Sequence, residues 1–226
     1  MSERHATSGG SESVEAARPL SPQVTNSKIF NLEYDVTDLG GANVARVELW
    51  VTENAGQSWQ PYGTDADLES PFLVEVDAEG TYGYQLLIHS SEGRSTRPPQ
   101  AGDRPEMSIL VDTTKPIAFL KRAGLSARTP GVIEIEWQAS DKTLSAESIK
   151  LSYAETLNGP WTLIASNVKN TGRYLWQLPE HLPQTVNIQI DVVDDGGNRT
   201  VHQLAQPTPT QPSEPRGRIK AIRTDK

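Results

Sequence analysis

The chain has 226 residues, of which 35% are hydrophobic, and its formal net charge is −8. It contains no cysteine, which excludes disulfide bonds, thiolate catalysis and cysteine-bound zinc. Residues 206–226 carry five basic and two acidic side chains, so the rest of the chain is more acidic than the whole, and we expect it to bind no nucleic acid.

The N-terminal residues 1–24 are rich in Ser, Gly and Glu and show no hydrophobic periodicity, so we expect a disordered segment. The chain begins at Met1 without the apolar core of a secretory signal, and no apolar run reaches the roughly 18 residues that span a bilayer. We therefore expect a fragment of a longer exported protein, extracellular or in the cell envelope. A cytoplasmic location is the alternative if Met1 is the native start.

Alternating apolar residues predict the first strand at residues 29–36, with one face on a core and one in water. Turn signals separate it from the further strand candidates, at residues 43–51, 59–62, 72–76, 82–89 and 107–111. Short strands at these intervals predict one β-sandwich over residues 25–115.

The segment Val111-Asp-Thr-Thr-Lys-Pro116 marks a boundary, because proline forces Lys115 out of helical geometry. A second unit then follows over residues 116–205, and its first strand candidate is residues 132–139. There Ile133, Ile135 and Trp137 must face inward, because the opposite phase would bury two carboxylates. The later strand candidates of this unit are residues 148–153, 161–164, 174–178, 186–193 and 200–204.

Apolar positions repeat at an interval of 102 residues, which indicates two copies of one domain. The repeated pairs include Trp59 with Trp161, Leu49 with Leu151, Val76 with Leu178 and Ile88 with Ile190. No stretch has a helical apolar stripe, so an α/β fold is excluded. Residues 206–226 contain four prolines followed by a basic run, which predicts an extended, disordered tail.

The second copy resembles fibronectin type III-like and bacterial immunoglobulin-like modules. The resemblance rests on Trp137, Tyr153, Trp161 and the run Ile188–Asn198, and in the first copy on Asp112-Thr-Thr-Lys-Pro116. It implies an all-β fold of two tandem immunoglobulin-like (fibronectin type III-like) β-sandwiches with disordered N- and C-terminal tails. It also implies a non-catalytic module of a larger bacterial envelope or extracellular protein.

The segment Thr52–Trp59 is similar to the Asp-box motif, with Asn54 in place of the aspartate. We interpret it as a structural hairpin in which Asn54 bonds to the turn backbone, Gly56 takes a positive φ and Trp59 packs on the hairpin. We expect Trp137 and Trp161 to be structural as well.

The four histidines show no metal-ligand spacing, and no nucleophile motif is present. We therefore expect no enzyme, no catalytic residue and no cofactor. We expect no metal site. The only candidates for calcium ligands are Asp191, Asp194 and Asp195, which crowd one strand end, and a solvated turn is the favoured interpretation.

Exposed aromatic residues offer the clearest contact surface, and Trp50 and Trp176 are the candidates for ligand binding. The first hypothesis is a non-catalytic interaction or spacer module whose partner is a protein, a polysaccharide or a neighbouring domain of a longer chain. End loops near Gly40, Asp195 and Asn198 would contribute to recognition. The alternatives are a carbohydrate-binding accessory module of an envelope enzyme and, if the chain is complete, an intracellular adaptor.

Overall fold

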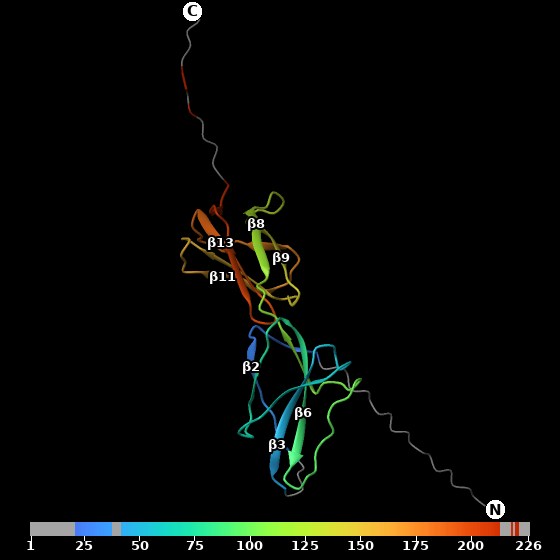
Figure 1. Cartoon of the computed structure of the whole chain (residues 1–226). Coiled ribbons are helices and arrows are strands. Elements are labelled where there is room, and N and C mark those ends of the chain that lie inside the picture. The colour runs from blue at the N-terminus through green and yellow to red at the C-terminus, as the bar shows by residue number, and fades with distance from the viewer. Residues whose placement is uncertain (1–20, 38–41, 213–217, 219, 222–226) are drawn as a thin grey trace, which may run out of the picture.

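The computed structural model describes residues 21–37, 42–212, 218, 220 and 221, and every helix-or-strand element in these ranges is a β-strand. Figure 1 shows the strands gathered in two bodies that join end to end, one coloured blue to green and one yellow-green to red. Within the described ranges there is no helix with the length and hydropathy needed to cross a bilayer. Predictions for the remaining residues, Gly40 included, lie outside the described part.

The first body is a sandwich of a five-stranded sheet, in the order β1-β7-β6-β3-β4, and a two-stranded sheet of β2 and β5. Its strands are β1 (Gln23–Thr25), β2 (Ile29–Leu32), β3 (Val44–Thr52), β4 (Gln60–Thr64), β5 (Phe72–Glu75), β6 (Gly80–Ser90) and β7 (Met107–Val111).

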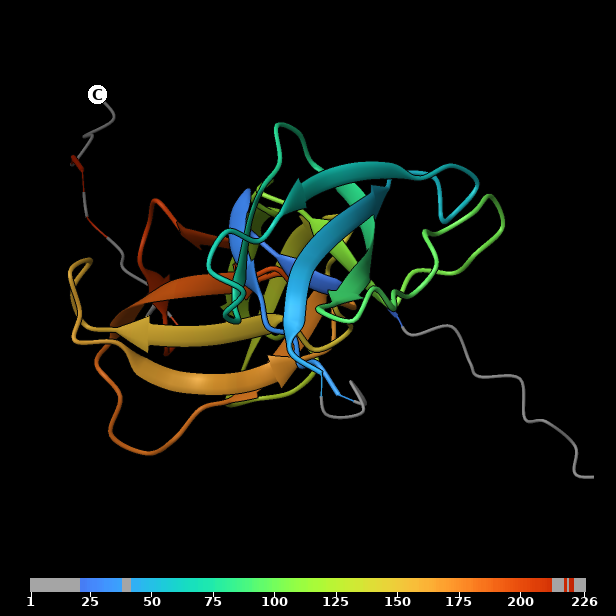
Figure 2. The ribbon, with the colours of Figure 1, turned by 60° about the horizontal axis from the view of Figure 1, so that its bottom comes forward.

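The second body pairs a sheet in the order β11-β10-β13-β14, with β15 beside β13, and a three-stranded sheet in the order β12-β9-β8. Its strands are β8 (Ile117–Leu125), β9 (Val132–Ser140), β10 (Ile149–Ala154), β11 (Thr162–Val168), β12 (Arg173–Gln177), β13 (Thr185–Val193), β14 (Arg199–Gln203) and β15 (Thr208–Pro209). In Figure 2 the gold and orange strands of this sandwich run across the view while β3 stands nearly upright, so the two sandwiches are turned relative to each other.

The strand order is the same in both sandwiches apart from the first strand. The second strand pairs with the fifth, and the third, fourth, sixth and seventh strands share the opposite sheet. This arrangement confirms the predicted all-β fold of two tandem immunoglobulin-like sandwiches. The first strand differs, because β1 lies parallel to β7 whereas β8 lies antiparallel to β9.

The inward phase predicted for the second sandwich is confirmed. Ile133 and Ile135 are 0% exposed and Trp137 is 2% exposed, and they pack in one cluster with inward residues of β10 and β13. The core of the first sandwich is built around Leu49, Tyr84 and their neighbours on the facing sheet.

The repeat interval of 102 residues holds for the third strands but not for the sixth. Leu49 pairs with Leu86 across β3 and β6, whereas Leu151 pairs with Ile190 across β10 and β13. The counterpart of Ile190 is therefore Leu86, and the predicted match of Ile88 with Ile190 is wrong by two residues. The second copy holds two more residues between its third and sixth strands, so one sequence interval cannot align both.

Three strands lie where none was predicted. The nine-residue β8 precedes the predicted start of the second unit at Val132, and its Lys121-Arg122 pair interrupts the apolar run that would have revealed it. The predicted disorder is wrong where β1 begins at Gln23 and where β15 follows residue 206. There Thr208 is buried, and it pairs with Val186 of β13.

Candidate functional site: the joint between the sandwiches

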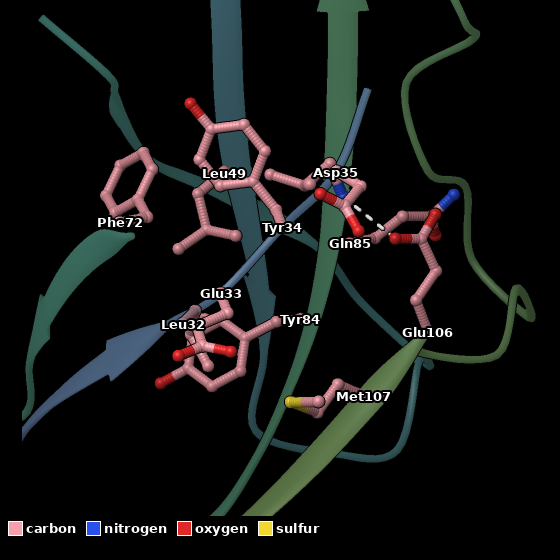
Figure 3. A pocket seen from close by; sticks show the side chains of 11 residues that line it. Leu32, Glu33, Tyr34, Asp35, Leu49, Phe72, Tyr84, Gln85, Glu106 and Met107 are labelled. Atoms are coloured by element: carbon pink, nitrogen blue, oxygen red, sulfur yellow. Dashed lines mark hydrogen bonds between the residues drawn. The ribbon is translucent and has the colours of Figure 1, made fainter. Parts of the chain in front are cut away.

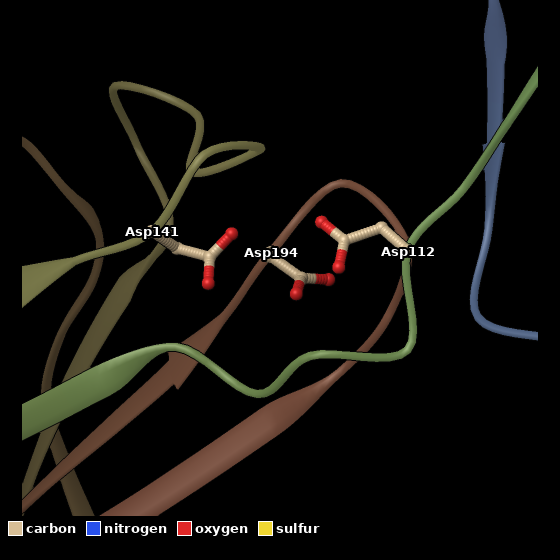
Figure 4. Close-up of side chains that lie close together, drawn as sticks. All are labelled: Asp112, Asp141 and Asp194. Carbon is tan, nitrogen blue, oxygen red and sulfur yellow. The ribbon is translucent and has the colours of Figure 1, made fainter. Parts of the chain in front are cut away.

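The joint is the place where charged side chains from separate segments converge. Asp112 follows β7, Asp141 follows β9, and Asp194 follows β13. One carboxylate oxygen of each lies within 4.8 Å of the others, and Figure 4 shows the three side chains close together at the joint. Asp112 and Asp194 are buried, and Asp141 is half-buried.

Asn198 ties the two sandwiches together at this point. Its Nδ2 donates to the backbone carbonyl of Asp112 at 2.7 Å and to Oδ2 of Asp194 at 2.9 Å. Its backbone N–H donates to Oδ1 of Asp194 at 2.8 Å, which closes the turn Asp194-Asp-Gly-Gly-Asn198. A buried amide thus bridges the end of the first sandwich to a turn of the second.

Hydroxyl groups complete the bridge. Thr143 Oγ1 lies 2.7 Å from Oδ2 of Asp112 and 3.1 Å from Oδ1 of Asp141, so this hydroxyl also links the two sandwiches. Thr200 Oγ1 donates to the carbonyl of Pro116 at 2.6 Å. The connection between β7 and β8 is therefore held from several sides.

The connecting segment is also anchored to the first sandwich. The carboxylate of Glu79 accepts hydrogen bonds from the backbone and hydroxyl of Thr113 and from the hydroxyl of Thr114. These bonds, those of Thr113 first, lower the pKa of Glu79 below its usual value. The Asp-Thr-Thr-Lys-Pro segment consequently lies fixed between the sandwiches.

The predicted calcium residues have different positions. Only Asp194 belongs to the converging group, because both oxygens of Asp191 bind the guanidinium of Arg199 at 2.6 and 2.7 Å, and Asp195 is exposed. Asp112 belongs to the group although only its segment, as the domain boundary, was predicted to matter. Asp141, which carries no local motif, was not predicted.

The acidic group is chemically suited to a cation. Among the described residues, no lysine, arginine or histidine forms an ion pair with Asp112, Asp141 or Asp194. Carboxylate and carbonyl oxygens are the ligands that Ca²⁺ prefers. The backbone carbonyl of Thr143 already accepts a hydrogen bond from the N–H of Asp195 at 3.0 Å, so the three carboxylates are the candidate ligands.

The aromatic residues expected to bind a ligand do not form one surface. Trp176 is wrong as a ligand-binding residue, because it is 6% exposed and packs on Tyr153 in the second core, with ring centroids 4.9 Å apart. Trp50 does point away from the core, since Leu49 and Val51 on either side are buried, but it is itself only half-exposed. Of the two tryptophans predicted to bind a ligand, only Trp50 therefore remains on a surface.

The Asp-box-like turn has the local geometry expected of a hairpin brace. Oδ1 of Asn54 accepts the N–H of Ser58 at 2.9 Å, and Oγ1 of Thr52 accepts the N–H of Gly56 at 2.9 Å. Gly56 has φ +88°, and a Cβ there would lie 1.9 Å from the carbonyl oxygen of Asp103. The glycine is therefore required both by its φ and by a crossing backbone that the sequence does not reveal.

The other tryptophans vary in burial. Trp137 is in the core, and its Nε1 donates to Oδ1 of Asn170 at 3.1 Å. Trp59 and Trp161 are half-buried beside their hairpins. Their structural role remains a prediction that substitution would test.

Two of the histidines, His89 and His202, have contacts that the structure describes, and His89 contacts charged residues. Its Nε2 lies 3.2 Å from the carboxylate of Glu48 and 3.3 Å from the guanidinium of Arg46. His202 accepts the backbone N–H of Leu120 through Nδ1 at 3.1 Å. Neither contact pairs a histidine with a nucleophile.

No family model and no curated protein matches the sequence. Among solved structures, the chain is similar to the fibronectin(III)-like modules of Clostridium thermocellum CbhA, at 15% identity and a TM-score of 0.49, over 89% of this chain and 98% of that one. It is similar to domains FN1-FN3 of chicken CNTN1, at 11% identity and a TM-score of 0.42, over 83% and 65% of the two chains. It is also similar to a tetra-tandem repeat in the extending region of a large adhesion protein, at 12% identity and a TM-score of 0.39, over 76% and 43%.

Proposed function

We propose that this chain is a non-catalytic spacer and interaction unit, part of a longer exported protein of the cell envelope or the extracellular space. The observation that carries the proposal is the buried bridge of Asn198, which bonds to both sandwiches across the joint. A spacer must hold its modules at a defined angle, and this bridge supplies that restraint.

The restraint comes from buried polar groups that would lose their hydrogen-bond partners if the joint bent. Domains in tandem move relative to each other unless their interface restrains them. One intramolecular hydrogen bond contributes only about 1 kcal/mol, but a buried polar group left without a partner costs about 1–3 kcal/mol. Bending the joint would leave Asn198, Thr143 and the carboxylate of Asp112 without their partners, so the bent states are disfavoured.

The test is the distribution of angles between the sandwiches, measured by small-angle scattering and residual dipolar couplings on the full chain. We expect Asn198→Ala to broaden this distribution while each sandwich stays folded. The matched control is Asn158→Ala, at an exposed turn of the second sandwich. A distribution that is equally broad in the unsubstituted chain and in Asn198→Ala would contradict a spacer held by this bridge.

A second property is favoured by the convergence of Asp112, Asp141 and Asp194, which have no cationic partner among the described residues. We propose that the joint binds a hard divalent cation such as Ca²⁺, which would offset the repulsion of three carboxylates. Binding would stiffen the same joint, because the ligands come from both sandwiches.

Thermal unfolding with and without calcium tests this second property. A ligand that binds the folded state at 100 times its Kd adds about 2.7 kcal/mol, so the unfolding midpoint should rise with calcium and return with EDTA. Asp141→Asn should abolish the rise, while Asp195→Asn, the exposed neighbour, should retain it. An unfolding midpoint that changes with neither calcium nor EDTA would contradict the cation proposal. It would not affect the proposal of a spacer held by hydrogen bonds.

The carbohydrate-binding alternative is weakened, because one of the two tryptophans predicted to bind a ligand, Trp176, lies in the core.

The location outside the cytoplasm is tested by mapping the native termini in fractionated source cells. Peptides that extend beyond both ends in an envelope or medium fraction would support it. A chain that begins at Met1 in the cytoplasm would favour the intracellular adaptor.

A further inference from the structure

The first sandwich has an open edge where the second sandwich is closed. In the second, β9 pairs with β12 on one side and with β8 on the other. In the first, β2 pairs with β5 only, because the short β1 lies against β7 instead. Among the described residues, no strand lies beside the other edge of β2 or beside its continuation at residues 33–36.

A cavity of about 220 Å³ occupies the uncovered region (Figure 3). It is lined by the continuation of β2 and by β6 and the start of β7, with apolar side chains that include Leu32, Leu49 and Met107. A neighbouring hollow extends it along β6 past Leu86 and Ile88. Together they form a groove, defined here by residues 32–37, 84–86, 88, 94–96, 106 and 107.

Equivalent residues in the two sandwiches show what the groove lacks. Leu86 corresponds to Ile190 and Ile88 to Val192, by their pairing with the third strand of each sandwich. Ile190 and Val192 are 0% exposed, in one cluster with Leu120 of β8, whereas Leu86 and Ile88 are only half-buried. The groove is therefore the place that a first strand fills in the second sandwich.

The charges of the lining specify the kind of segment that would fit. Glu33, Asp35 and Glu106 border the cavity, which no lysine, arginine or histidine lines. The neighbouring hollow includes Arg94, whose guanidinium binds the carboxylate of Glu92 at 2.9 Å. In the second sandwich the filling strand carries Arg122, whose guanidinium binds the carboxylate of Glu136 on β9 at 2.6 and 2.9 Å. An extended segment with a basic residue would make the same type of pair here.

We propose that the open edge of the first sandwich binds an extended peptide segment of a partner protein, with alternating apolar residues and at least one Arg or Lys, by addition of a strand beside β2. Unpaired strand edges are templates for this type of binding, in which backbone hydrogen bonds give affinity and side-chain pockets give specificity. The apolar residues would cover Leu86 and Ile88, and the basic residue would lie near Glu106.

The probe is a synthetic peptide with the sequence of residues 117–125, the strand that fills the corresponding place in the second sandwich. Titrated into the full chain, it should shift the NMR signals of the Leu86, Ile88 and Met107 methyl groups and slow amide exchange at residues 33–36. A scrambled peptide of the same composition should do neither. Shifts outside the groove, or equal shifts with both peptides, would overturn the proposal.

Charge reversal at Glu106, which borders the cavity, is the second test of the proposal. Glu106→Lys should weaken peptide binding by about tenfold or more, and raising the salt concentration should weaken binding to the unsubstituted chain. The matched control is Glu180→Lys, at an exposed turn of the second sandwich, which should leave the affinity within about twofold. Equal affinities for the two variants, with both folded, would contradict recognition at this rim.

Two other occupants of the groove, the chain's own N-terminal segment and a second copy of the chain, are tested separately. Because the chain has no cysteine, a single Val14→Cys accepts a spin label, and broadening of the Leu86 and Ile88 methyl signals at low concentration would assign the groove to the chain's own N-terminal segment. Self-association that rises with concentration and is lost in Glu106→Lys would assign it to a second copy. Either result would overturn binding of a partner protein.

Discussion

The two sandwiches share a strand order but differ in where their first strand lies. In the second sandwich β8 covers one edge of β9 and completes the core, so Ile190 is fully buried. In the first, β1 pairs with β7, and the equivalent Leu86 faces a groove. The position of one strand thus makes one sandwich closed and the other open at the corresponding edge, and the proposed peptide binding depends on this difference.

The largest expected effect comes from truncating the two equivalent residues. Ile190→Ala should lower the free energy of unfolding of the second sandwich by about 3–4 kcal/mol, because it leaves a cavity in a close-packed core. Leu86→Ala should cost the first sandwich only about 1–2 kcal/mol, because its side chain is half-exposed to the groove.

Urea unfolding followed by tryptophan fluorescence measures both changes. Trp50 and Trp59 report on the first sandwich, and the other three tryptophans report on the second. Equal losses at the two positions would mean that the groove is filled in solution, which would remove the difference between the modules.

A smaller effect is expected from the turn that braces the first sandwich. Gly56→Ala should destabilise it by about 2–3 kcal/mol or more, because the new methyl group would collide with the carbonyl of Asp103 as well as strain the positive φ. Gly93→Ala is the matched control, with φ +80° and no atom within 4 Å of an added Cβ. It should cost only about 1 kcal/mol.

The same unfolding measurement distinguishes the two glycines, and the second sandwich should be unaffected by either substitution. A loss at Gly56 no larger than that at Gly93 would show that the loop containing Asp103 moves aside, and that the turn and this loop are not tightly packed.

The smallest effect concerns acid stability. The guanidinium of Arg97, at 2.6 and 2.9 Å, and the N–H of Gln100 lower the pKa of Asp103 to about 2. Because the pKa is below the unfolded value of about 3.9, the stabilising contribution is complete above that pH and is lost as the pH falls through about 2.

Asp103→Asn should therefore lower the midpoint of the first sandwich near pH 6 and have progressively less effect toward pH 2. The midpoint of the second sandwich, measured in the same scans, is the internal reference. A uniform effect at every pH would show that the aspartate acts through its shape and not through its charge.

Local patterns accounted for most strands and for the core of the second sandwich. The phase of residues 132–139 followed from two glutamates that could not be buried, and it placed Ile133, Ile135 and Trp137 correctly. The bonds of Asn54 were also predictable, since they join residues at most four apart. Trp176 was misplaced as a ligand residue, because its alternating segment does not reveal which phase faces the core.

The sequence by itself determined an all-β chain of two similar units, because side-chain alternation and turn residues act over a few positions. The tertiary structure alone decided which residues meet across the joint, since Asp112, Asp141 and Asp194 are far apart in the chain and converge only when three strand ends do. It likewise decided the open edge of the first sandwich. The partner of β1 is chosen by the packing of whole sheets, and three residues carry too little pattern to specify it.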